Sequence, residues 1–89
     1  MEGLDFGVAL RAAKEGKRIA RKGWNGVGMF VYYVPSAKYP AMTEVAKKHF
    51  GNTDVQYRAY LALKTAQGDV ATWAPSGSDT LAEDWEILD

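Results

Sequence analysis

The chain has 89 residues, with eleven basic and eleven acidic side chains, so its formal net charge is zero. This length fits one domain, residues 1–89, with a thin core, and the neutral charge argues against binding to a nucleic-acid polymer, which usually requires a basic excess. The chain has no cysteine and one histidine, which excludes a disulfide and argues against a thiolate- or histidine-built metal site.

The first third of the chain predicts a helix and two strands. Asp5 is a good N-cap, the apolar residues that follow recur at helical spacing, and Gly16 is placed to end the helix in a left-handed conformation. Strands are expected at residues 17–21 and 29–34, joined by a turn at residues 23–26. The second strand is apolar on both faces and needs cover on both. The first helix supplies one cover, and a neighbouring subunit is a candidate for the other.

The remainder predicts short elements around one long strand. In chain order we expect a connection at residues 35–40, a short helix capped by Thr43 and ending at Phe50, a turn at 51–54 and a long strand at 55–65. These are followed by a hairpin loop at 66–69, a strand at 70–74, one helical turn at 79–82 capped by Ser78, and a last strand at 84–88. The predicted fold class is therefore α+β: a small, mainly antiparallel sheet with one main N-terminal helix and short additional helices.

The stretch from residue 20 to residue 30 carries the clearest functional signal. Arg21 and Trp24 stand beside Asn25 and Gly26 at one bend of the backbone. An aromatic plate suits stacking on a base, an amide both donates and accepts hydrogen bonds, and a nearby cation suits a phosphate. The alternative is that Trp24 fills the core, Asn25 serves the turn and the cations face water.

Four further residues complete the candidate ligand-binding set. Arg58 is expected inside the long strand, where its planar guanidinium suits bidentate phosphate contact, although a surface ion pair is the alternative. Trp73 and Trp85 are aromatic candidates whose alternative role is core packing. Asp84 belongs to an acidic stretch around Trp85 that a solvated surface also explains. The candidate ligand-binding residues are Trp24, Asn25, Gly26, Arg21, Arg58, Trp73, Asp84 and Trp85.

Nothing in the sequence predicts catalysis. No nucleophile with its base is visible, and the glycines fit neither the dinucleotide nor the P-loop spacing. His49 is expected on a helix surface. The chain begins without a signal-peptide pattern and contains no stretch of membrane-spanning length. We therefore expect a protein without enzymatic activity, cofactor or membrane contact, located in the cytoplasm.

The order of these motifs resembles a known family. The distinctive segments are Arg21-Lys-Gly-Trp-Asn-Gly26 and Leu81-Ala-Glu-Asp-Trp85, supported by the helix opening at Asp5 and by Trp73. They are similar to the small phage and prophage proteins of the second Thoeris anti-defence type. The resemblance covers nearly the whole chain, and residues 35–56 are its least family-like part.

The resemblance implies a sponge for an immune signal. Members of that family bind a cyclic ADP-ribose isomer without degrading it, so that the Thoeris effector stays inactive in the host bacterial cytoplasm. They form homotetramers with pockets shared between subunits, and some relatives also hold cyclic oligonucleotides at another site. Trp24 and Asn25 are the first positions to carry over. Two other functions stay open at this point: an oligomeric protein–protein interaction module without a nucleotide ligand, and an enzyme that cleaves a nucleotide signal.

Overall fold

The computed structural model describes residues 1–88, and its first element confirms the predicted helix. The α1 helix spans Phe6–Lys14. The Asp5 side chain accepts a hydrogen bond of 2.9 Å from the Val8 amide and so caps the first turn. Gly16 follows with φ at 98°, a conformation that favours glycine at the end of a helix.

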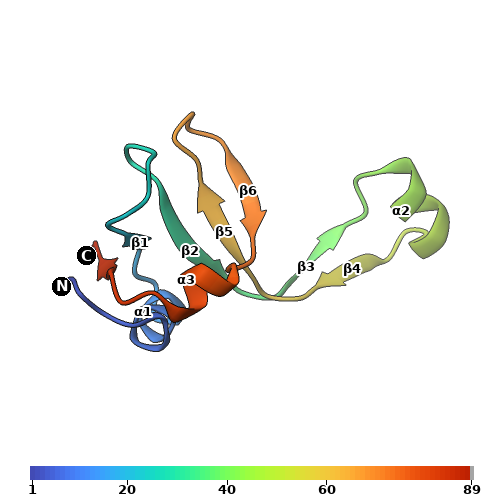
Figure 1. Ribbon diagram of the computed structural model, residues 1–89. Helices are drawn as coiled ribbons and strands as arrows, with labels where there is room; N and C mark the ends of the chain where they lie inside the picture. The colour runs from blue at the N-terminus through green and yellow to red at the C-terminus, as the bar shows by residue number, and fades with distance from the viewer. Residues whose placement is uncertain (89) are drawn as a thin grey trace.

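A five-stranded antiparallel sheet forms the body of the molecule (Figure 1). Its strands lie in the order β6-β5-β2-β1-β7, so the two ends of the chain meet at one edge. Ile19 of β1 pairs with Val31 on one side and with Ile87 on the other. The strands of this sheet are β1 (Ile19–Arg21), β2 (Phe30–Val34), β5 (Tyr60–Lys64), β6 (Val70–Trp73) and β7 (Trp85–Ile87).

The core lies between α1 and one face of this sheet. Ala9 and Ala13 of α1 are fully buried, together with Ile19, Val31 and Trp85 of the strands. Small helix residues let the α1 backbone approach the sheet closely, while the large strand residues fill the space. The fully buried apolar area supplies most of the stabilisation.

The opposite face of the sheet is apolar and has no helix over it within residues 1–88. Alternation along β2 places Phe30, Tyr32 and Val34 on this face, opposite Val31. Their partners on β5 across the ladder are Lys64, Ala62 and Tyr60. The side chains on this face are half-buried, and the Arg18 guanidinium and the Lys64 ammonium lie over the Phe30 ring, 5.2 and 6.0 Å from its centroid.

A second unit projects from the body as an arm, residues 37–57 (Figure 1). It contains β3 (Ala37–Pro40), α2 (Glu44–Phe50) and β4 (Asp54–Tyr57), with β3 and β4 paired as a separate two-stranded sheet. The arm makes the molecule elongated, with extents of 47 × 25 × 24 Å. Thr43 caps α2 and Gly51 ends it, as predicted.

The arm overturns two predictions from the sequence. Residues 35–40 are not only a connection, because Ala37–Pro40 forms β3. Residues 55–65 are not one strand either: β4 pairs with β3 in the arm, and β5 pairs with β2 in the body. The chain changes sheets at Arg58 and Ala59. The apolar alternation runs through this junction, so the sequence pattern alone did not reveal the break.

The last helix begins two residues earlier than predicted. The α3 helix spans Gly77–Leu81, and Ser76 rather than Ser78 is its N-cap. Ser76 and Asp79 form a reciprocal capping box, in which each side chain accepts a hydrogen bond from the other's backbone amide. Within residues 1–88, no helix is long and apolar enough to cross a membrane.

Candidate functional site

A hollow lies where the loop of residues 22–29 meets the edge of the sheet. Its volume is about 320 Å³. It brings together three residues of the sequence-based site, Arg21, Trp24 and Gly26, and Asn25 lies exposed in the same loop. We call this space the Trp24 hollow; it is lined by Ala20, Arg21, Lys22, Trp24, Gly26, Gly28, Met29, Glu86 and Leu88.

Glycines let the loop fold tightly over this hollow. Gly28 has φ at 75°, where a residue with a side chain is strained. A Cβ atom at Gly26 would overlap the Met29 side chain and lie 3.0 Å from the Ala66 Cβ atom. The Lys64 ammonium donates a hydrogen bond of 3.2 Å to the Gly28 carbonyl and ties the loop to β5. The loop is therefore packed against the sheet along its second half.

Arg21 is held by two carboxylates. Its Nε atom donates to Asp84 at 2.8 Å, and its Nη1 atom donates to Asp79 at 2.9 Å. The hydrogen bond from Arg21 lowers the pKa of Asp84. Burial opposes ionisation of Asp79, but hydrogen bonds from Ser76 and Arg21 outweigh it and lower the pKa of Asp79 as well. The same two carboxylates raise the pKa of Arg21, Asp84 first.

Trp24 rests on an aromatic cluster rather than standing alone. Its ring meets Trp73 and Trp85 edge to face, with centroids 6.2 Å and 5.5 Å away. Trp85 is 0% exposed, and its Nε1 atom donates to the Asp79 carbonyl at 2.8 Å. Trp85 thus has no surface open to a ligand in this conformation. Its position is that of a core-packing residue, which was the alternative to ligand binding in the sequence. Trp73 and Trp24 are half-buried.

Arg58 lies apart from this cluster. It is exposed, it stands between β4 and β5 at the base of the arm, and it does not line the Trp24 hollow of its own chain. The prediction that a strand fixes its guanidinium is wrong, because residues 58 and 59 are outside both strands.

The structure also adds residues to the site that were not in the predicted set. Lys22, Gly28, Met29, Glu86 and Leu88 line the hollow. Gly28 and Lys22 stand in the stretch that the sequence singled out. Glu86 and Leu88 lie at the hollow because β7 pairs with β1, with Glu86 opposite Ala20. That pairing joins the two distinctive segments in space, and only the register reveals it.

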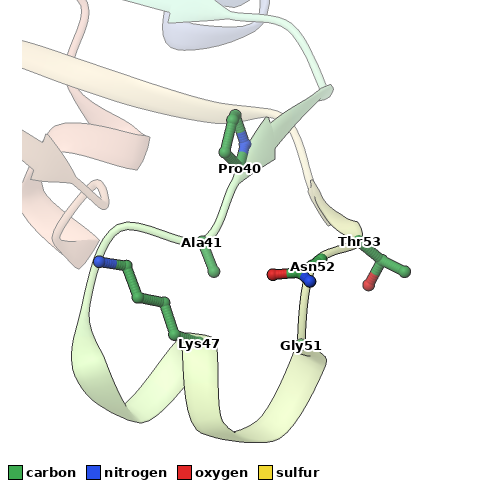
Figure 2. Close-up of a pocket in the computed structure, with 6 residues that line it drawn as sticks. All are labelled: Pro40, Ala41, Lys47, Gly51, Asn52 and Thr53. Atoms are coloured by element: carbon green, nitrogen blue, oxygen red, sulfur yellow. The ribbon is translucent and has the colours of Figure 1, made fainter.

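A second hollow lies in the arm (Figure 2). Its volume is about 270 Å³. The Asn52 side chain points across the opening toward Ala41, while Lys47 runs up from α2 on the other side. Thr53 is turned away and donates to the Phe50 carbonyl at 2.7 Å. No aromatic residue lines this hollow, so the Trp24 hollow is the better candidate site. Residues 1–88 hold no cluster of side chains suited to a metal ion.

Comparison with known proteins assigns the family. The model of the Tad2-like family, the Thoeris anti-defense 2-like domain, matches residues 4–88. The chain belongs to this family. It is also 34% identical over 85 residues to a protein named Thoeris anti-defense 2 from Bacillus phage SP01, a match that covers 96% of this chain and 94% of the relative. The match includes both distinctive segments, α1 and the arm, and it confirms the resemblance seen in the sequence. Family membership supports a phage function directed against Thoeris defence.

Proposed function

We propose that this protein binds and sequesters a cyclic ADP-ribose immune signal without degrading it, and so blocks activation of the Thoeris effector. The observation that carries the proposal is the Trp24 hollow, which is lined by Trp24, loop glycines and Lys22 of a Thoeris anti-defence chain. Binding without turnover suits a site in which no nucleophile–base pair is apparent. The protein needs no cofactor for this function.

The composition of the hollow suits a flat, anionic ligand. Trp24 is half-buried and is the candidate aromatic surface for adenine, and the backbone amides around Gly26 and Gly28 are candidate donors to a pyrophosphate. Lys22 lines the same hollow, with its ammonium paired to Glu2 at 2.7 Å in the single chain, and Asn25 supplies an amide. A neutral chain exerts little long-range attraction, so recognition of phosphate has to be local.

A second copy of the chain would complete the site. At about 320 Å³, the hollow is at the lower end of the range of roughly 300–1,000 Å³ for ligand pockets. Within residues 1–88 no helix lies over the outer face of β2, and the arm exposes large apolar side chains such as Met42 and Val45. We therefore propose a homo-oligomer, a tetramer built from two dimers, that acts in the host bacterial cytoplasm and has pockets shared between subunits.

Calorimetry against a panel of cyclic ADP-ribose isomers and cyclic oligonucleotides tests the ligand. We expect saturable binding of a cyclic ADP-ribose isomer, and the panel also shows whether cyclic oligonucleotides bind. The complex is then denatured by heat and the ligand is analysed by mass spectrometry. Intact ligand supports sequestration, whereas a cleaved product would show an enzyme. Absence of binding to every isomer would refute the proposal.

The exposed arm favours a second candidate, an oligomeric protein–protein interaction module. Met42 and Val45 are 79% and 81% exposed, so packing within one chain does not account for these apolar side chains. On this hypothesis the aromatic residues serve assembly or a host protein and no nucleotide binds. A ligand-free complex with a host protein, unaffected by added cyclic ADP-ribose, would favour the module over the sponge.

A further inference from the structure

We propose that Arg21 is a positioning residue, which holds the loop of the Trp24 hollow in its binding conformation through Asp84 and does not itself contact the phosphates of the ligand. The inference rests on the proposed function for the identity of the ligand. The structural part concerns the loop alone and is tested without any ligand. It differs from the sequence-based hypothesis, in which Arg21 is a phosphate contact.

The hydrogen bonds run from Arg21 through Asp84 to the loop. One carboxylate oxygen of Asp84 accepts from Arg21 Nε at 2.8 Å, and the other accepts from the Gly23 amide at 3.0 Å. The Lys22 amide donates to the Asp84 carbonyl at 3.0 Å, and the Trp24 amide donates to the Arg21 carbonyl at 3.2 Å. Thus the start of the loop is attached to Asp84 by two backbone donors, and Arg21 fixes the orientation of that carboxylate.

A second carboxylate fixes Arg21 itself. Asp79 accepts from Arg21 Nη1 at 2.9 Å and is tied in turn into the capping box of α3 with Ser76. The side chains of Arg21, Asp79 and Asp84 are 21%, 14% and 34% exposed. Partly buried charges at these distances form stronger hydrogen bonds than neutral groups do. With Nε and Nη1 each engaged by a carboxylate, the guanidinium is fixed in orientation, and a phosphate could reach only its remaining N–H groups, beside two negative charges.

The packing of Gly23 gives an independent indication of how tightly the loop start is held. A Cβ atom at Gly23 would lie 2.9 Å from the second Asp84 oxygen. That oxygen belongs to a flexible side chain, but Arg21 restrains it, so the carboxylate cannot turn aside without losing the ion pair. Gly23→Ala therefore perturbs the same contact by shape and leaves every charge in place.

Hydrogen–deuterium exchange on the ligand-free oligomer tests the positioning role. We expect Arg21→Gln, Asp84→Asn and Gly23→Ala each to speed exchange of the amides in residues 22–28 by about tenfold or more, the scale expected for losing a hydrogen bond to a charged group. Exchange in β2 and β5 should stay as in the wild type, which separates loop opening from unfolding. Glu15→Gln, an exposed charge change at the end of α1, is the control. Unchanged loop exchange in Arg21→Gln and Asp84→Asn would overturn the proposal.

The sign of one binding effect distinguishes positioning from direct contact. Removing a negative charge beside an anion site strengthens binding on electrostatic grounds, and it also frees Arg21. If Arg21 positions the loop, Asp84→Asn instead weakens binding of the cyclic ADP-ribose isomer, because the competent conformation is less populated. The double variant Arg21→Gln/Asp84→Asn then loses no more affinity than the worse single variant.

Calorimetry with the isomer that binds the wild type best measures both effects. Tighter binding by Asp84→Asn, or fully additive losses in the double variant, would overturn the positioning role. If the wild type binds no isomer, the proposed function fails, and the exchange experiment still decides whether Arg21 and Asp84 hold the loop.

Discussion

Trp24 and Trp85 meet edge to face with ring centroids 5.5 Å apart, although they stand in segments at opposite ends of the chain. The contact forms because β7 pairs with β1, so Trp85 lies opposite Arg21 and below the turn that carries Trp24. One ring is fully buried and the other is half-buried at the hollow. The core of the protein thus directly supports the aromatic residue that the proposed site presents.

This support gives Trp24 two measurable roles. We expect Trp24→Ala to weaken ligand binding by about 1–3 kcal/mol, the usual scale for one base–aromatic stack. It should also lower the free energy of unfolding, since contacts with Trp73 and Trp85 are lost. Trp24→Phe should retain part of both. Calorimetry and urea unfolding of the same samples separate the two effects; normal affinity in a folded Trp24→Ala variant would remove Trp24 from the site.

Trp85 should behave as a core residue only. We expect Trp85→Ala to lower the free energy of unfolding by about 3–5 kcal/mol, as for other large buried aromatic residues. Trp85→Phe should cost less, through the lost hydrogen bond to the Asp79 carbonyl and the smaller ring. Urea unfolding at a fixed protein concentration measures both. If Trp85→Phe folds normally but loses ligand affinity while the loop around Trp24 is unchanged, Trp85 contacts the ligand directly.

The sequence predicted the local elements well because their signals are local. Asp5, Gly16, Thr43 and Gly51 all act within one turn of the helix that they begin or end, and each lies where it was expected. The division of residues 55–65 depends instead on the strand with which each half pairs. Apolar alternation is the same whether a strand continues or changes sheet, so it did not predict the junction at Arg58.

In the candidate site, too, the sequence indicated the local grouping of residues but not the long-range contacts. The loop residues Arg21, Trp24 and Gly26 are neighbours in sequence and line one hollow in the structure, while their role in binding stays a prediction. The engagement of Arg21 by Asp79 and Asp84 spans 58 and 63 residues. Nothing in the spacing of these residues predicts such a contact, because it requires the antiparallel register of β1 and β7 and the position of α3.

The arm is expected to be an assembly surface. Tyr39, Pro40, Met42, Tyr57 and Tyr60 line an apolar hollow of about 280 Å³ on it. We expect the wild type to be a tetramer by light scattering at micromolar concentration, and Met42→Lys to shift it toward smaller species, since a charge would be buried at the interface. Leu81→Lys, with an equally exposed apolar residue on α3, is the matched control. A monomeric wild type would refute assembly, and an unchanged Met42→Lys tetramer would place the interface elsewhere.

Acid should weaken the attachment of the loop. The pKa of Asp84 is lowered from its ordinary value of 3.8, chiefly by the hydrogen bond from Arg21, and the pKa of Asp79 is lowered from the same value against the opposing effect of burial. A carboxyl group with a lowered pKa in the folded state stabilises that state above its unfolded pKa. This contribution is lost as the pH falls through the folded pKa.

We therefore expect these two groups to add no pH dependence above about pH 5, and a progressive loss of stability below about pH 4, where these carboxylates take up protons in the unfolded state before they do so in the folded state. The measurement is the free energy of unfolding against pH for the wild type, for Asp84→Asn and for the control Glu15→Gln. Below about pH 4 the free energy of unfolding of Asp84→Asn should fall less steeply with decreasing pH than that of the wild type, because one of the two groups no longer titrates. The Glu15→Gln curve should follow the wild type in this window. Parallel curves for wild type and Asp84→Asn would mean that the Asp84–Arg21 contact does not favour the ionised carboxylate in the folded protein.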